Sequence, residues 1–381
     1  MSEGERRGPY DYTKGSIGWG IFRIAFPTFG EQIIWRLDAL TELFWVGRLG
    51  PEYLAAMALG FLVILLIRGV GFGIRVAGQA LVAQRVGAGD NEGAALMAGQ
   101  IFSLLAMILV PIVILGIWLS PRIIALFTSD PRILQLGTGY LRAGFAVLFF
   151  IEGQLTLAQL FRGSGEPSFS VAGMIVSTAV SVAAMPLFIF GAWGIPAFGL
   201  PGAFLGSGLG KAAGTIVLSY FITSGRSRIH LRRDHLRPRR ELLIRIAGLS
   251  WPVTVQSLLE RGANLVILRV LSIFGAYALA AWGLGNRVTL TARIPGMCIH
   301  GAVRTMVGQN IGAGLPDRAQ KCVWLGLWTA ALFVGATSIA LYFTADAVAR
   351  SFGMQGEAGR IGAMCLRFLS VGVTFDACRR V

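Results

Sequence analysis

The chain has 381 residues, of which 55% are hydrophobic and only 14% are charged, and its mean hydropathy is +0.67. Soluble domains carry about 25% charged residues, so this composition excludes an ordinary soluble protein and indicates a polytopic membrane protein. The formal net charge of +15 does not indicate a nucleic-acid partner, because two of the arginines lie in the tail before the first span and eight in the polar stretch 224–245, and positively charged segments of this kind are typical of the cytoplasmic side of a membrane protein.

Continuous apolar segments follow one another along the chain and predict membrane-spanning helices. Each complete segment exceeds the roughly 20 residues that a helix needs to cross the hydrocarbon, and none alternates as barrel strands do. Six segments precede a basic stretch, at about 17–47, 53–80, 94–118, 138–161, 168–192 and 198–222. Four more follow it, at about 246–272, 278–303, 319–344 and from 359 onward.

These segments predict four regions: a cytoplasmic tail at 1–16, a six-helix bundle at 17–223, a basic cytoplasmic linker at 224–245, and an incomplete bundle at 246–381. Six spans between tail and linker place both basic regions on the same side of the membrane, as the positive-inside rule requires. The four cysteines show no CxxC spacing, so neither a disulfide framework nor a zinc site is expected.

An internal repeat relates the two predicted bundles. The stretch that begins at Val82 returns at Val307, and the same offset of 225 residues pairs Pro27 with Pro252. So long a period indicates two large homologous halves, which in an apolar chain is typical of a transporter. Each copy is expected in the turn after the second span of its bundle. The second half is about two spans shorter than the first, so we expect a C-terminally truncated form of a twelve-span protein.

Several motifs resemble those of one transporter family. They are the repeated Gln-x-x-Gly-Ala-Gly of 84–89 and 309–314, Glu42-Leu43-Phe44-Trp45-Val46-Gly47-Arg48-Leu49-Gly50, and the turn Arg162-Gly163-Ser164-Gly165. With these motifs the chain resembles the multidrug and toxic compound extrusion (MATE) family. The resemblance implies an all-α fold of two six-helix bundles, about ten of whose twelve spans are present, and a transporter without catalytic residues or cofactor.

Acidic residues within the predicted spans are the candidates for ion coupling, because a central charge there costs about 2.5–3.5 kcal/mol even on insertion scales. They are Glu31, Asp38, Glu42, Glu152, Glu260 and Asp376. Asp38 and Glu42 are four residues apart and share one helix face, where two like charges favour a shared proton or cation. Glu42 matches the position of the family's span-one aspartate. The alternative is that the two acids pair with Arg36 or with an arginine of another span.

Glu260 and Asp376 form a second candidate site. Through their spacing and sequence context they match the acidic residues of the family's sodium-coupled branch, so the resemblance implies a sodium site there. The alternatives are an ion pair of Glu260 with Arg261 and a solvated helix end at Asp376, beside Arg379 and Arg380.

Other polar residues in the spans have simpler interpretations. Glu152 and His300 are expected to be structural, and the repeat-related Arg68 and Arg293 to brace the bundles or bind phospholipid head groups. The stretch from Gly206 to Ala212 lacks the first glycine and the Ser/Thr of a phosphate loop, so ATP binding is not expected.

Together these features predict a secondary transporter in the bacterial inner membrane, with its N-terminus in the cytoplasm. It would export cationic or amphipathic compounds in exchange for sodium ions or protons, contact membrane lipids and act as a monomer. Two alternatives remain open. One is a flippase of lipid-linked oligosaccharides from the same superfamily, and the other is a membrane enzyme acting on lipid phosphates, although no metal-binding acidic cluster is apparent.

Overall fold

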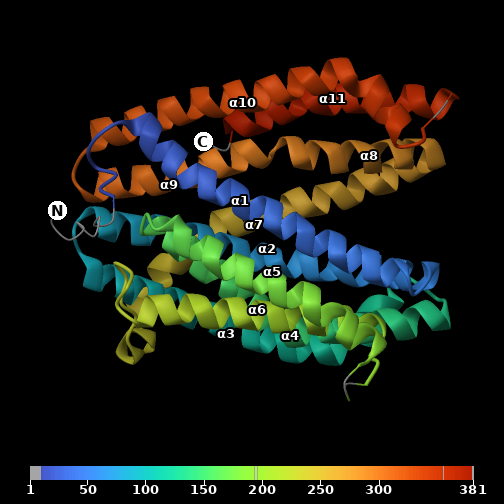
Figure 1. The fold of residues 1–381 in the computed structure, drawn as a ribbon, viewed down its shortest axis with the longest axis horizontal. Coiled ribbons are helices and arrows are strands. Elements are labelled where there is room, and N and C mark those ends of the chain that lie inside the picture. The colour runs from blue at the N-terminus through green and yellow to red at the C-terminus, as the bar shows by residue number, and fades with distance from the viewer. Residues whose placement is uncertain (1–9, 193, 195, 355, 380–381) are drawn as a thin grey trace, which may run out of the picture. The chain divides into compact units, whose positions relative to one another are not determined.

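The computed structural model describes residues 10–192, 194, 196–354 and 356–379, and most of these residues are helical (Figure 1). This confirms the predicted all-α class. The first half holds α1 (Ile17–Gly47), α2 (Pro51–Gly87), α3 (Asn91–Ala125), α4 (Pro131–Gly163), α5 (Pro167–Phe190), α6 (Leu200–Thr223) and the 3-10 helix η1 (Arg233–Leu236). The second half holds α7 (Arg240–Ile273), α8 (Ala276–Ala292), α9 (Ile294–Gly312), α10 (Pro316–Ser351) and α11 (Gly356–Arg379).

The prediction of one continuous span over 278–303 is wrong, because two separate helices occupy this segment. α8 ends at Ala292 and α9 begins at Ile294, with Pro295 in the first turn of α9. A proline has no N–H to donate to the carbonyl four residues earlier, so the helical hydrogen bonds are interrupted at this point. Each of the other predicted segments corresponds to one helix.

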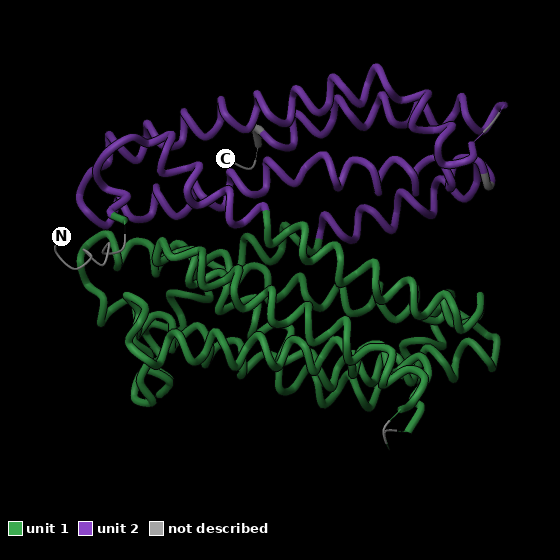
Figure 2. Tube along the Cα trace, viewed as in Figure 1, with its two compact units in different colours: residues 1–10, 30–258 green, residues 11–29, 259–381 purple. Residues whose placement is uncertain are grey.

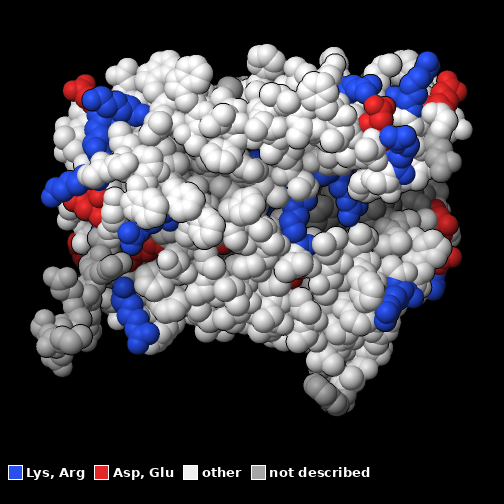
Figure 3. Space-filling model, turned by 45° about the horizontal axis from the view of Figure 1, so that its top comes forward, with Lys and Arg blue, Asp and Glu red and all other residues white. Residues whose placement is uncertain are grey.

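Eight helices of the described part are long and apolar enough to cross a membrane: α2 to α7, α10 and α11. α8 is too short after the break, with 17 residues, and charged residues are spread along α1. Figure 3 shows one face of the molecule, on which uncharged atoms cover most of the area between the helix ends. Such a surface suits contact with lipid.

The chain divides into two compact units, which Figure 2 distinguishes by colour. Unit 1 contains 30–258 and unit 2 contains 11–29 and 259–381. The divisions fall inside α1 and α7, the first helices of the two repeats, shortly after Pro27 and Pro252. The predicted bundle boundaries at 223 and 246 were placed by the sequence repeat, whereas the two units are defined by contacts between residues. The predicted boundaries therefore stay a prediction.

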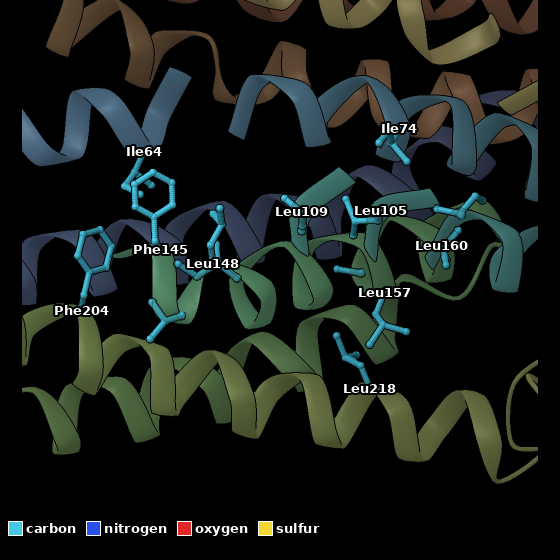
Figure 4. Close-up of a cluster of buried hydrophobic side chains, with 14 of the residues drawn as sticks. Ile64, Ile74, Leu105, Leu109, Phe145, Leu148, Leu157, Leu160, Phe204 and Leu218 are labelled. Atoms are coloured by element: carbon cyan, nitrogen blue, oxygen red, sulfur yellow. The ribbon is translucent and has the colours of Figure 1, made fainter. Parts of the chain in front are cut away.

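Unit 1 is built around α4, which packs against α2, α3, α5 and α6. Its buried side chains include Tyr140, Phe145 and Leu148, which are at most 1% exposed. In Figure 4, Phe145 and Leu148 lie among apolar side chains of the neighbouring helices, such as Ile64 of α2 and Phe204 of α6. This dense core makes unit 1 a stable frame for the polar groups that it encloses.

Glycines spaced by four residues bring α5 and α6 into close contact. Gly202, Gly206, Gly210 and Gly214 lie along one side of α6, and a Cβ added to any of them would meet backbone atoms of α5. Without side chains at these positions the two helices approach closely, which is how helices associate in lipid. The glycines that faintly resembled a phosphate loop therefore serve helix packing.

Unit 2 has a smaller core, formed where α10 and α11 pack together and against α8 and α9. One cluster is centred on Leu284, Leu341 and Leu366, and another contains Val334 and Val373. The N-terminal segment also belongs to this unit, because the Asn310 side chain donates a hydrogen bond to the carbonyl of Tyr12.

The repeated stretch forms the same turn twice, between α2 and α3 and between α9 and α10. In each copy the alanine N–H donates to a glutamine carbonyl, Gln84 or Gln309, and the next glycine has a positive φ, 75° at Gly89 and 72° at Gly314. Glycine adopts this conformation without the strain that a side chain causes. The first copy thus follows α2, the second span of its repeat as predicted, and the second copy follows α8 and α9, the two helices that occupy the predicted segment 278–303.

Candidate ion-coupling site

Asp38 and Glu42 lie one turn apart in the part of α1 that belongs to unit 1. Asp38 is buried, and Lys211 Nζ donates a hydrogen bond to Asp38 Oδ2 over 2.8 Å. Lys211 stands in the middle of α6 and is also buried. The cationic partner of Asp38 is therefore a lysine of another span, where an arginine had been considered.

Glu42 accepts a hydrogen bond of 2.8 Å at Oε1 from the hydroxyl of Tyr140 on α4. Tyr140 is fully buried in the core of unit 1. Asp38 and Lys211 both act electrostatically on the Glu42 carboxylate. Helices α1, α4 and α6 thus bring four side chains together, which we call the α1 acid cluster: Asp38, Glu42, Tyr140 and Lys211.

The charges of the α1 acid cluster do not balance. When its side chains are ionised, two carboxylates face one ammonium group, which leaves one negative charge. Asp38 Oδ1 is buried and accepts no hydrogen bond from the described residues. A buried charge without compensation is costly, and one proton or one monovalent cation would remove it. The cluster therefore has the chemistry that an ion-exchange site requires.

Glu31 also lies in the unit 1 part of α1, but its charge is compensated. Its carboxylate pairs with Arg162 of α4 and accepts a hydrogen bond from the Ser170 hydroxyl of α5. Arg162 also donates to Gln159, whose amide donates to Gln79 of α2 over 2.7 Å. This balanced network joins four helices, so its chemistry is that of a structural brace.

Glu152 of α4 is fully buried between two arginines of α2. Arg68 Nε lies 3.3 Å from its Oε1, and Arg75 pairs with its Oε2. The contact places Arg68 between α2 and α4, where it can act as the brace that was one of its two predicted roles. With both arginines ionised, this group carries one positive charge and has no need of a further cation.

In unit 2, Asp376 of α11 lies beside Arg293, with 3.6 Å between Asp376 Oδ2 and Arg293 Nη1. Glu260 is half-buried on α7. The described residues contain no group of three or more His, Cys, Asp or Glu side chains suited to hold a metal ion. The sodium site at Glu260 and Asp376 stays a prediction, and Arg380, part of one alternative, lies outside the described residues.

Lys211 and Tyr140 were not predicted as members of the site. A lysine in the middle of an apolar span is itself a signal, because such a charge needs a partner within the protein. In the sequence, Lys211 lies within the stretch Gly206–Ala212, which faintly resembles a phosphate loop. Tyr140 carried no signal, since a tyrosine in a span is ordinary.

Comparison with known proteins shows the family to which this chain belongs. The MatE family model matches residues 27–187 and 252–381. The chain is 23% identical over 334 residues to the probable multidrug resistance protein YoeA of Bacillus subtilis, covering 87% of this chain and 72% of that protein. It is 27% identical over 341 residues to the multidrug resistance protein NorM of Burkholderia vietnamiensis, covering 86% and 70%. A FAD transporter of Shewanella oneidensis is 23% identical over 314 residues, covering 82% and 70%.

Solved structures share the fold. A MOP superfamily transporter from Pyrococcus furiosus superposes with a TM-score of 0.86 at 22% identity, covering 98% of this chain and 83% of that one. A MATE family transporter in an outward-facing conformation gives a TM-score of 0.83 at 23% identity, covering 99% and 84%. The predicted resemblance is thereby confirmed. The chain belongs to the MatE family and is a multi-pass membrane transporter rather than an enzyme.

Proposed function

We propose that this protein exports cationic and other amphipathic compounds in exchange for protons, and that the α1 acid cluster binds the proton. The observation that carries this proposal is the uncompensated negative charge of Asp38, Glu42 and Lys211 inside unit 1. Relatives named as multidrug resistance proteins support the substrate class.

The composition of the cluster favours a proton over a sodium ion. Sodium is a hard cation and prefers several oxygen ligands, whereas Lys211 already places an ammonium group against Asp38. A proton needs only one carboxylate oxygen, and Glu42 has no lysine or arginine within ion-pair distance in the described part of the chain. Protonation of either carboxylate makes the cluster neutral.

Antiport requires that the two access states differ in their affinity for the proton and for the substrate. The cluster joins α1 to α4 and α6, so the bonds of Asp38 and Glu42 hold this part of α1 against unit 1. Proton binding weakens the attraction to Lys211 and thereby lowers the cost of moving α1. We infer that this exchange couples proton binding to release of the substrate.

Glu260 and Asp376 are the alternative coupling residues, with sodium as the ion. Arg293 beside Asp376 would compete with a bound cation, and this favours the α1 acid cluster. We propose further that the protein acts as a monomer in the bacterial cell membrane, with its N-terminus and the basic linker in the cytoplasm. The arginines between α6 and α7 support this orientation.

Transport by the purified chain in proteoliposomes tests the assignment. Ethidium movement is followed under a pH gradient or a sodium gradient for the native chain and for Glu42→Gln, Asp38→Asn, Glu260→Gln and Asp376→Asn. Glu357→Gln, at an exposed position on α11, is the matched control. We expect pH-driven transport to fall at least tenfold in Glu42→Gln and to persist in Glu260→Gln and in the control. Undiminished pH-driven transport by Glu42→Gln would show that the cluster is not the coupling site.

The substrate class needs a separate assay, because one relative is named a FAD transporter. The same vesicles are offered ethidium, FAD and a fluorescent lipid-linked oligosaccharide. We expect pH-driven export of ethidium. Movement of the oligosaccharide alone would favour the flippase alternative, and movement of FAD alone would replace cationic drugs by a flavin nucleotide.

A further inference from the structure

The basic linker between α6 and α7 is held against unit 1 by hydrogen bonds. The Gln100 side chain of α3 donates to the carbonyls of His235 and Arg237, each over 2.8 Å, and accepts a bond of 2.7 Å from Arg239 N. Ser103 donates to the carbonyl of Leu236 over 2.7 Å. The linker backbone from 235 to 239 is thus fixed on the side of α3.

A second set of contacts fixes the first part of the linker. Glu166, in the turn between α4 and α5, accepts hydrogen bonds from the Ser227 hydroxyl at 2.6 Å and from Arg228 N. Ile229 is fully buried. His235 contacts Glu92 of α3 with 2.9 Å between Nε2 and Oε1. Side chains that project outward from this linker therefore have a fixed base.

Arginines project from this base into solvent, and we call them the arginine platform: Arg226, Arg232, Arg233, Arg237, Arg239 and Arg240. The exposed acids of this stretch are Asp234, which lies 3.7 Å from Arg237, and Glu241. The side chains of Arg233, Arg239 and Arg240 form no ion pair or hydrogen bond with the residues that the structure describes. The six arginines of the platform therefore outnumber its two acids, and Arg233, Arg239 and Arg240 keep positive charges that no described residue pairs with.

The platform lies where the lipid-facing surface begins. On α7, Ile244 is 60% exposed only four residues after Arg240. On α6, Tyr220 is exposed and the Arg226 guanidinium lies 5.4 Å from its ring. Aromatic side chains of this kind mark the boundary between hydrocarbon and head groups, and lipid phosphates occupy that level.

We propose that the arginine platform binds the phosphate groups of anionic phospholipids in the adjacent leaflet. Guanidinium groups bind phosphate oxygens through paired hydrogen bonds, and several arginines beside a span attract acidic lipids. The fixed linker backbone keeps these groups at the head-group level. This inference does not depend on the transported substrate or on the coupling ion.

Native mass spectrometry and lipid titration of the purified chain test the proposal. Phosphatidylglycerol and phosphatidylcholine are titrated into the native protein and into the triple variant Arg233→Gln, Arg239→Gln, Arg240→Gln. The matched control replaces three exposed arginines at other helix ends, Arg122→Gln, Arg350→Gln and Arg360→Gln. We expect the platform variant to bind phosphatidylglycerol about tenfold more weakly, the control to bind as the native chain does, and phosphatidylcholine to bind poorly throughout.

Each other result overturns the proposal. Equal affinity of the platform variant and the native chain, or an equal loss in the control, would remove the platform from lipid binding. Inorganic phosphate or an RNA oligonucleotide that displaces the lipid at equal concentration would assign the arginines to a soluble anion. Melting temperatures of all variants confirm folding. In addition, Gln100→Ala keeps the charges but removes an anchor, so native affinity in that variant would refute the role of the fixed backbone.

Discussion

Arg293 and Asp376 form an ion pair in unit 2 that matches an ion pair in unit 1 through the repeat. The offset of 225 residues relates Arg293 to Arg68 and places Asp376 beside the equivalent of Glu152. Arg68 pairs with Glu152 in the same way, between the second and fourth spans of its repeat. Both halves thus keep an arginine and an acid at this junction, although the acid has shifted by one residue.

The relationship predicts that Asp376 contributes to the packing of unit 2. Removing either partner breaks this ion pair, so Arg293→Gln and Asp376→Asn should each destabilise the protein. Because both groups are partly exposed, the interaction should be worth about 1 kcal/mol or less. Melting temperatures of the two single variants and the double variant, combined in a double-mutant cycle, measure it. Additive effects would show that the pair contributes nothing, and an added sodium ion that stabilises only the native chain would favour the sodium site.

A larger effect is expected at Asp38 and Lys211, because both are buried. Lys211→Met leaves Asp38 as a buried charge without a partner, which costs about 3–5 kcal/mol. We expect poor yield of folded protein in detergent from this variant. Adding Asp38→Asn should restore most of the yield, since the buried charge that Lys211 compensates is then absent as well. Fluorescence-detected size exclusion measures both, and a double variant as unstable as Lys211→Met would contradict the pairing.

The sequence indicated the spans and the repeat because long apolar runs and a constant offset are local or linear signals. It also indicated Asp38 and Glu42, since acids in an apolar helix are conspicuous. Their partners could not be predicted. Lys211 is 173 residues from Asp38 and Tyr140 is 98 residues from Glu42, and no spacing rule connects positions that meet only through the packing of α1, α4 and α6.

The break between α8 and α9 shows a second limit. Pro27, Pro111 and Pro252 lie inside continuous helices, whereas the helix is interrupted just before Pro295. A proline removes one hydrogen bond in every case. Whether a helix continues past its proline depends on how neighbouring helices pack against the segments before and after it. This packing cannot be predicted from the residues around the proline alone.

The close contact of α5 and α6 predicts sensitivity at Gly206. A Cβ at this position would lie 2.6 Å from Met185 Cα, so Gly206→Ala must push the two helices apart. Overpacking of this kind costs about 1–3 kcal/mol. Gly248→Ala on α7 is the matched control, because a Cβ there meets no atom within 4 Å and alanine favours a helix. A lowered melting temperature is expected for Gly206→Ala alone, and equal behaviour of the two variants would contradict the packing argument.

The two copies of the repeated turn differ in their helix caps, and this predicts a stabilising substitution. Asp90 caps α3 by accepting a hydrogen bond of 2.8 Å from Gly93 N, whereas the equivalent Leu315 supplies no side-chain cap to α10. The backbone already suits a cap, with φ and ψ of −113° and 65° at Leu315 against −88° and 74° at Asp90.

Leu315→Asp should therefore stabilise α10 by about 0.5–2 kcal/mol, because its carboxylate can accept a hydrogen bond from an unpaired N–H of the first turn. Leu315→Ala serves as the control, since it removes the same leucine without adding an acceptor. The melting temperature of Leu315→Asp should exceed that of Leu315→Ala, and the converse substitution Asp90→Ala should lower that of the native chain. If Leu315→Asp melts no higher than Leu315→Ala, the equivalence of the two turns does not extend to capping.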